Sequence, residues 1–351
     1  MNKLNTLIAF LSIILITACG GGGGGGSSES PTPTPAPTPA PTPAPNVYDP
    51  INATYTDKQW DSNATGWSAR FNDNLFLEYA QFTGTSTYDL TTNVYQNSNE
   101  SYDVTYDGID SNNESYYFNF DINVANTNVT PLYLYGDPDT PAFYLNYSEF
   151  ADSFVYFFDI DRDYLNSLGI EYVSLAQLQV YRLADEQEFL FPTTYGDFTE
   201  SEDVPTSGTV TKEGGTIAYY HEQDSTGNIQ ITASGETNLE FNFSQGTVSG
   251  SILYNDYVLY SEFMAGNGAS GQITTLPDIE LKLSSGQILG NAFGANLEYI
   301  LDGNVVGQGY LEGYFYGPDA NEIGASYFIF DADDTDDLFW LSGGALIGEN
   351  M

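Results

Sequence analysis

The sequence predicts an all-β protein with two β-rich units behind a disordered tether. Apolar and polar residues alternate in segments 118–124, 239–243 and 279–284, and this period of two is typical of a half-buried strand. Turn residues separate such segments at intervals of about 8 to 12 positions, as in sandwiches and barrels. Hydrophobic residues make up 41% of the chain and aromatic residues 15%. This composition supports packed cores and argues against a wholly disordered acidic chain.

The chain is strongly acidic, with 48 Asp and Glu against 7 Lys and Arg and a formal net charge of −41. Lys3 and Glu29 are the only charged residues before residue 46, so the net charge belongs to the rest of the chain. Proteins bind nucleic acids and anionic membranes through Lys and Arg, which neutralise phosphates. The composition therefore excludes nucleic acid as a partner and leaves neutral, basic or cation-loaded partners.

Residues 1–18 predict a lipoprotein signal peptide. Lys3 precedes an apolar run, Leu7–Ile16, whose ten residues are too few to span a bilayer, which needs about 20. The run leads into Thr17-Ala18-Cys19, which resembles the cleavage site of bacterial lipoproteins, where the new amino-terminal Cys carries the lipid. Cys19 is therefore the predicted lipid-attachment residue. It is also the single Cys of the chain, which excludes a disulfide framework and a Cys-rich metal site.

Residues 19–46 predict a tether. Gly20 follows the lipidated Cys, where an Asp would retain a lipoprotein at the inner membrane, so the outer membrane is the expected location. An uninterrupted run, Gly20–Gly26, forms a flexible coil, and from Pro31 to Pro45 every second residue is proline. Such a proline-rich segment extends as a polyproline II rod of roughly 45 Å. The arrangement holds a folded body away from a membrane.

Glycine and tyrosine divide the remaining chain into two predicted domains, residues 47–200 and 201–351. Residues 46–204 contain 6 Gly and 18 Tyr, whereas residues 205–351 contain 22 Gly and 10 Tyr. Glycine weakens ordinary strands but permits tight bends and close backbone approach at barrel corners. The second domain is therefore predicted to be a small closed barrel.

Two local elements are also predicted. The acidic segment 161–168, which ends before Gly169, indicates a helix of about two turns. Asp302-Gly303-Asn304 lies between apolar runs and predicts a hairpin, because primed turns need residues that tolerate positive φ.

Several segments from Glu171 onward resemble the transferrin-binding protein B family of surface lipoproteins. Tyr172–Leu175 resembles the last strand of that family's handle domain, and segment 195–209 resembles its junction into the barrel. Leu239–Gly250 resembles a barrel hairpin with its turn at Gln245-Gly246. The most specific match is Gly309–Gly324 (GYLEGYFYGPDANEIG), where a Gly-x-Phe-Tyr-Gly-Pro strand end runs into Ala-x-Glu-x-Gly. Asp319–Glu322 is expected to form one helical turn before a closing strand at 325–330.

The resemblance implies a β-rich handle-like domain at 47–200 and an eight-stranded Gly-rich antiparallel barrel at 201–351. It further implies a surface protein that binds its ligand without catalysis and without a cofactor. The implied ligand is an iron- or haem-carrying protein, or a small solute, delivered to a TonB-dependent receptor. The family's namesake has two handle–barrel lobes, whereas this chain has room for one. The namesake's ligand-binding loops cannot be aligned with this sequence, so the ligand-binding residues remain unassigned.

Residues suited to catalysis or metal binding form no recognisable motif. His221, the only His, precedes a turn and lacks a Gly-x-Ser-x-Gly partner, so a surface position is favoured over a catalytic triad or metal ligation. Asp159, Asp161 and Asp163 alternate as in a calcium loop, but Tyr164 stands where that loop needs Gly. They are predicted to be the acidic start of the short helix. The acids of segment 331–337 could hold a hard cation, although a solvated loop is favoured.

Two other functions remain open. Aromatic residues such as Trp60 and Trp67 could stack on sugars in a carbohydrate-binding or adhesive module, although packing in a core is the default. A lipid-anchored hydrolase is the second alternative, because a paired carboxylate site would not stand out among 48 acids.

Overall fold

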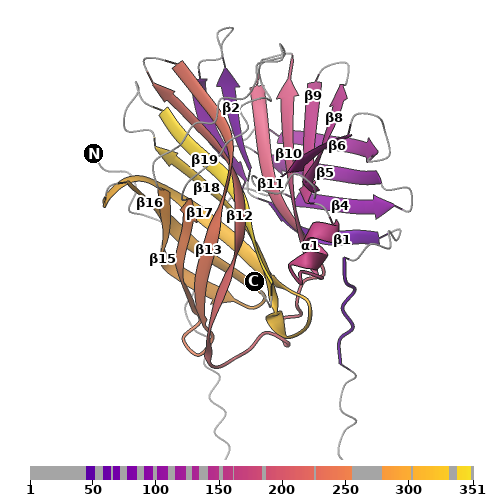
Figure 1. The fold of residues 1–351 in the computed structure, drawn as a ribbon, viewed down its shortest axis with the longest axis vertical. Coiled ribbons are helices and arrows are strands. Elements are labelled where there is room, and N and C mark those ends of the chain that lie inside the picture. Colours follow the sequence, from indigo (N-terminus) through magenta and orange to yellow (C-terminus); the bar gives the residue numbers. More distant parts are fainter. Residues whose placement is uncertain are drawn as a thin grey trace, which may run out of the picture. The chain divides into compact units, whose positions relative to one another are not determined.

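The computed structural model describes residues 45–51, 58–64, 66–71, 77–84, 91–97, 101–109, 115–123, 129–133, 141–149, 153–160, 162–183, 187–224, 227–254, 279–301, 303–331 and 338–348. The chain divides into two compact units, Met1–Pro45 and Asn46–Met351. All described elements belong to the second unit, and apart from one short α-helix and a 3-10 turn they are strands. Figure 1 shows these elements coloured along the chain. The all-β class predicted from the sequence is confirmed.

The first half of the described chain forms one antiparallel sheet, called the handle sheet below. Its strands lie in the order β6-β5-β4-β1-β11-β10-β9-β8-β7, while β2 also pairs with β11 and β3 pairs with β2. The strands are β1 (Lys58–Ala64), β2 (Gly66–Phe71), β3 (Leu77–Gly84), β4 (Thr91–Asn97), β5 (Ser101–Ile109), β6 (Ser115–Asn123), β7 (Val129–Tyr133), β8 (Pro141–Glu149), β9 (Ser153–Ile160), β10 (Val173–Arg182) and β11 (Gln187–Gly196).

Strand β11 is the centre of the handle sheet because three strands use its edges. One edge pairs along its length with β10, from Val173↔Gly196 to Arg182↔Gln187. The other edge pairs with β1 at 193–196 and with β2 at 187–190. Strand β1 pairs with β11 through residues 61–64, and its first residues, 58–60, pair with β4. The predicted strand at 118–124 corresponds to β6.

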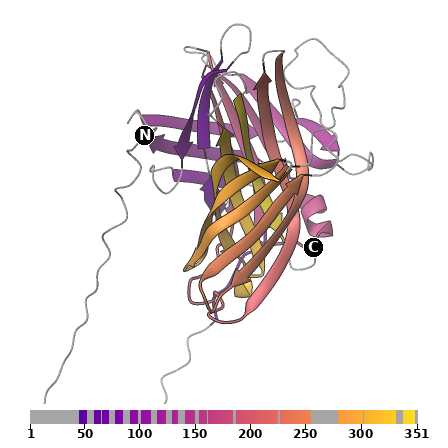
Figure 2. The same cartoon turned by 90° about the vertical axis from the view of Figure 1, so that its left-hand side faces the viewer.

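The second half of the described chain is a closed antiparallel barrel of eight strands, which Figure 2 shows from another side. The strands are β12 (Thr209–Asp224), β13 (Gly227–Asn242), β14 (Thr247–Tyr254), β15 (Ile279–Leu289), β16 (Ala292–Leu301), β17 (Asn304–Tyr316), β18 (Glu322–Asp331) and β19 (Leu338–Ile347). Successive strands pair along the chain, and β19 closes the barrel by pairing with β12.

The barrel strands follow the predicted alternation. Ile279, Leu281 and Leu283 of β15 are buried, whereas Lys282 between them is exposed. The predicted turn at Gln245-Gly246 joins β13 to β14, and Gly303 has a φ of 78° between β16 and β17. The predicted closing strand at 325–330 lies within β18, but β19 is the strand that closes the barrel. That part of the prediction was wrong because paired glycines obscure the apolar pattern of β19.

Side chains fill the barrel interior. One apolar cluster includes the rings of Phe241, Phe293 and Phe315, with the Phe241 and Phe315 centroids 5.2 Å apart and those of Phe293 and Phe315 5.4 Å apart. An eight-stranded barrel is just wide enough for its own side chains to occupy the interior. Val204, which precedes β12, and Ala320, which lies between β17 and β18, are buried in the same cluster. The barrel is therefore packed as a core.

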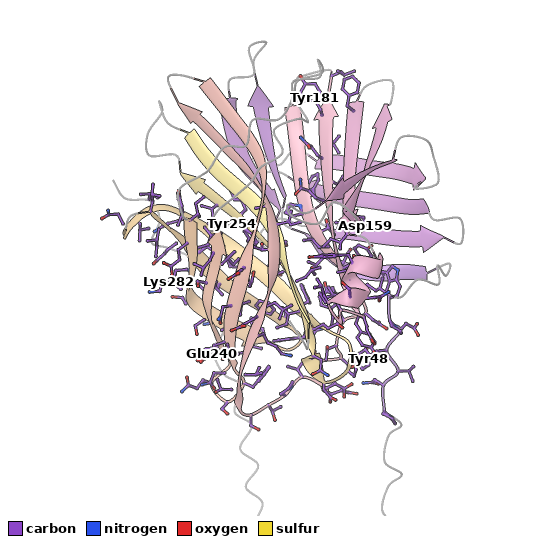
Figure 3. The ribbon with its side chains drawn as sticks, viewed as in Figure 1. Tyr48, Asp159, Tyr181, Glu240, Tyr254 and Lys282 are labelled. Atoms are coloured by element: carbon purple, nitrogen blue, oxygen red, sulfur yellow. The ribbon has the colours of Figure 1, made fainter. Side chains whose placement is uncertain are left out.

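A small group of hydroxyls lies within this apolar interior. Thr216 Oγ1 donates to the Gly344 carbonyl at 2.9 Å and lies 2.5 Å from Tyr327 Oη. The Tyr254 hydroxyl is hydrogen-bonded to the Tyr327 hydroxyl (Tyr254 is labelled in Figure 3). Burial raises the pKa of Tyr327 strongly, so this phenol stays protonated. Such a network compensates the cost of placing hydroxyls in an apolar core.

Helix α1 (Arg162–Ser167) lies between β9 and β10 in the chain. Its two ends each differ by one residue from those of the predicted helix, 161–168. The 3-10 turn η1 (Pro318–Ala320) replaces the helical turn expected at 319–322, and Glu322 begins strand β18. No helix in the described residues has the length and apolar character needed to cross a bilayer.

Candidate functional site

Most of the residues that sequence patterns indicated as sites lie outside the part of the chain that the structure describes. Cys19 and the acids at 333–337 lie outside the described residues, as does the side chain of Trp67. His221 belongs to β12, where its backbone pairs with Gln230 and Trp340, but its side chain is also outside the described part. Trp60 is only 4% exposed, so it is a core residue and offers no surface for a sugar.

Asp159 corrects one sequence interpretation. It belongs to β9 rather than to the start of α1, and it is buried at 6% exposure. Its carboxylate accepts hydrogen bonds from Tyr195 Oη at 3.1 Å and from Ser174 Oγ at 3.4 Å (Figure 3). Asp161 lies outside the described residues. Among those residues, no group of three His, Cys, Asp or Glu side chains is arranged to hold a metal ion.

The most elaborate polar arrangement connects the handle sheet to the barrel. Glu322, the first residue of β18, is 3% exposed. One of its carboxylate oxygens accepts the Glu171 backbone N–H at 2.6 Å, and the other accepts those of Tyr172 and Val173 at 2.7 and 3.0 Å. These donors immediately precede or begin β10. One barrel carboxylate therefore binds three successive amides of the handle sheet.

Burial determines the protonation of Glu322. Desolvation raises its pKa to about 7, although the three amide donors oppose that shift, and the negative charge of Glu171 adds to it. A carboxylate removed from water loses more hydration than these amides return. Glu322 therefore exchanges its proton near neutral pH.

The chain segment that leads from the handle sheet into the barrel is bonded to both. The Asp197 N–H donates to the Tyr172 carbonyl at 3.1 Å, and the Asp197 carbonyl accepts the Gly317 N–H at 2.9 Å. Thr199 donates its N–H to the Phe315 carbonyl and its hydroxyl to the Gly317 carbonyl, at 2.8 and 2.7 Å. The name joint is used below for residues 171–173, 197–199 and 315–324 together, where Phe315 contributes only its backbone and its ring belongs to the barrel core.

Apolar packing surrounds the polar contacts of the joint. Tyr316 of the barrel is buried in one cluster with Val173 and Leu175 of β10, and Leu165 of α1 belongs to the same cluster. The Phe198 ring stacks on Tyr314, with centroids 4.5 Å apart and planes 8° from parallel. The joint therefore combines a hydrophobic interface with direct bonds between backbones.

Two barrel glycines allow the handle sheet to approach the barrel wall. A Cβ on Gly324 would lie 2.8 Å from both Thr194 Cβ and Val173 Cγ2, and a Cβ on Gly344 would clash with Leu175 Cδ1. The sequence prediction assigned the glycines of this domain to barrel corners. At these two positions the close neighbour is the handle sheet.

A short segment ahead of the handle sheet crosses the joint. Residues Asn46–Ile51, called the strap, begin directly after Pro45, the last residue of the proline-rich segment. Tyr48 Oη donates to Asp203 Oδ2 at 2.5 Å and accepts the Glu200 N–H at 3.1 Å (Figure 3). The N–H groups of Asp49 and Ile51 donate to Asp197 Oδ2 and to the Glu171 carbonyl, each at 2.5 Å.

Comparison with protein families identifies the barrel. Residues 204–345 match the family described as C-lobe and N-lobe beta barrels of Tf-binding protein B. The barrel of this chain is similar to the barrels of transferrin-binding protein B. The strongest sequence resemblance, Gly309–Gly324, lies inside the matched region and contains both Glu322 and Gly324. The most specific motif of the barrel thus lies at the joint.

Solved structures similar to this chain include a double mutant of the vaccine antigen transferrin-binding protein B from Haemophilus parasuis. It is 14% identical with a TM-score of 0.38, and the match covers 80% of this chain and 63% of that protein. Transferrin-binding protein B from Neisseria meningitidis is 11% identical with a TM-score of 0.34, covering 82% and 63%. HpuA from Kingella denitrificans, solved in complex with human haemoglobin, is 10% identical with a TM-score of 0.33, covering 87% and 91%. No curated protein sequence matches the chain.

Proposed function

We propose that this protein is a lipid-anchored surface protein of the outer membrane that binds its ligand without catalysis. The observation that carries the proposal is the match of residues 204–345 to the barrels of transferrin-binding protein B. By that relationship the proposed ligand is an iron- or haem-carrying protein or a small solute, and the proposed recipient is a TonB-dependent receptor.

The amino-terminal sequence supports the anchoring. Cys19 follows an apolar run that is too short to span a bilayer, and the glycine run and proline rod follow Cys19. One acyl chain binds a membrane only marginally, so a stable anchor needs several. Lipidation at Cys19 in the bacterial lipoprotein pattern would supply them.

The packed barrel favours a ligand on the outside of the protein. Its described interior is occupied by the aromatic cluster around Phe315 and by the hydroxyl group around Thr216. A calyx-type barrel would need an open interior to hold a solute. The net charge of −41 further favours a ligand surface that is neutral or basic.

Binding can be tested with the mature, non-lipidated chain, using Cys19→Ser to remove the thiol. Transferrin, haemoglobin and free haem are each measured by interferometry at two ionic strengths, and proteins that co-purify are identified by mass spectrometry. We expect saturable binding to at least one iron or haem carrier. The absence of binding to all three contradicts the proposal. Glycan-array binding or substrate turnover abolished by a single Asp or Glu substitution would favour the carbohydrate-binding or hydrolase alternative instead.

The anchor is tested separately with Cys19→Ala in cells. We expect the variant to leave the membrane fraction, because it has no residue to carry lipid, while the matched variant Ser27→Ala stays there. Membrane fractionation followed by immunoblotting measures the distribution. Equal membrane association of the two variants contradicts lipid anchoring at Cys19.

A further inference from the structure

The backbone contacts of the strap fall on the joint, and its side-chain contacts fall on Glu200 and Asp203, which follow the joint in the chain. Glu171, which accepts from Ile51, also donates its own N–H to Glu322 of the barrel. Asp197, which accepts from Asp49, also bonds to Tyr172 and Gly317. Glu171 and Asp197 therefore both connect the handle sheet to the barrel and bind the strap.

Tyr48 binds the strap to a charged side chain. Its hydroxyl donates to Asp203, and Asn46 Nδ2 donates to the same Oδ2 atom at 3.0 Å. Desolvation and the hydrogen bond to Asp203 raise the pKa of Tyr48 to about 12. The hydrogen bonds from Tyr48 and Asn46 lower the pKa of Asp203, so the carboxylate stays charged at neutral pH. A charged acceptor makes these bonds stronger than neutral ones.

Little apolar burial holds the strap in place. Ile51 is 4% exposed and is the only hydrophobic side chain of the strap in the described core, whereas Val47 is 88% exposed. Backbone and hydroxyl hydrogen bonds at an exposed surface open at a lower free-energy cost than a packed core does. The strap can therefore separate while the barrel stays folded.

We propose that the strap is a releasable clasp through which tension on the amino-terminal tether is transmitted to the joint between the handle sheet and the barrel. Docked, the strap restrains Glu171 and Asp197 and stabilises the joint. Pulled from its amino-terminal end, it peels from Asp203 first and from Glu171 last. The proposal rests on anchoring through the amino-terminal tether and is independent of which ligand is bound.

Amide hydrogen exchange of the mature chain tests the docked state. In Tyr48→Ala we expect the amides of residues 171–173 and 317 to exchange about tenfold faster, which corresponds to losing one hydrogen bond to a charged acceptor. Amides of β14 and β15 serve as an internal reference for the folded barrel. Val47→Ala, at the exposed neighbouring position, is the matched control and should match the unsubstituted chain. Unchanged exchange at 171–173 and 317 in Tyr48→Ala, with the strap amides exposed, overturns the proposal.

Single-molecule pulling tests the response to tension. Cys19 is the only thiol, so the non-lipidated chain can be attached through it and pulled against a carboxy-terminal tag. We expect an initial extension of up to about 20 Å, the length of six extended residues, before the barrel unfolds. Tyr48→Ala should remove this step or lower its force, and Val47→Ala should retain it. A first extension that is the same in both variants, or none before the barrel unfolds, contradicts release of the strap.

Discussion

The barrel interior and the joint bury side chains by different means. In the barrel, rings such as Phe241, Phe293 and Phe315 fill the space between strands that neighbouring hydrogen bonds already hold. In the joint, Glu322 and Gly324 bring two separate sheets together, one by binding amides and the other by leaving space. The comparison indicates that the stability of the barrel depends on the volume of its buried side chains. The stability of the joint depends on the carboxylate of Glu322 and on the absence of a Cβ at Gly324.

Loss of volume in the barrel should have the largest effect. Phe315→Ala removes a fully buried ring that packs on Phe241 and Phe293. We expect the free energy of unfolding to fall by about 4 kcal/mol. Urea denaturation followed by circular dichroism measures it, with Leu289→Ala as the control because Leu289 is 73% exposed. Equal losses in the two variants would contradict a packed interior.

Removal of the Glu322 carboxylate should have the next largest effect. Glu322→Ala leaves the amides of Glu171, Tyr172 and Val173 without their acceptor. We expect a loss of about 3 kcal/mol in the free energy of unfolding, because buried donors without partners are costly. Glu240→Ala, on the exposed face of β13, should change stability by less than about 0.5 kcal/mol. Similar stability of the two variants would show that the amides find other acceptors.

The pH dependence of the free energy of unfolding should also differ between variants of the joint and variants of the barrel interior. The pKa of Glu322 is about 7 in the folded protein against 4.5 for an ordinary Glu, so the folded state retains its proton over that interval. The stability from this retained proton is fully present below pH 4.5 and is lost as pH rises through 7. The free energy of unfolding of the unsubstituted chain minus that of Glu322→Gln should fall by up to about 3 kcal/mol between pH 4.5 and 7.5. A constant difference across this range contradicts the raised pKa; Phe315→Ala should give such a constant difference.

Filling the space left by a barrel glycine that faces the handle sheet should have a smaller effect. Gly344→Ala places a Cβ against Leu175 and should lower the free energy of unfolding by about 2 kcal/mol through overpacking. In Gly307→Ala the nearest atoms would lie at 3.4 Å, an ordinary contact, so this variant is the matched control. Adding Leu175→Ala to Gly344→Ala should reduce the cost of the glycine substitution, as measured in a double-mutant cycle. Strictly additive losses would place the clash elsewhere.

Sequence patterns predicted the parts of the fold that depend on local alternation. The apolar positions of segments 239–243 and 279–284 identified strands of the barrel, and Gly303 identified a hairpin. The alternation could not show where Glu322 binds, because its partners are backbone amides about 150 residues earlier in the chain. The resemblance motif nevertheless contained Glu322 and Gly324, and the structure supplies a physical role for both.

The closure of the barrel has a further consequence for how such a domain can be combined with others. Gly215 near the start of the first barrel strand pairs with Leu346 near the end of the last. The chain therefore enters and leaves the barrel at the same end, an arrangement that generally permits insertion or tandem duplication of a domain. A second handle–barrel unit could follow this one through a short linker without opening either barrel. In evolutionary terms, the pairing of β12 with β19 makes the barrel a module that can be repeated within a chain.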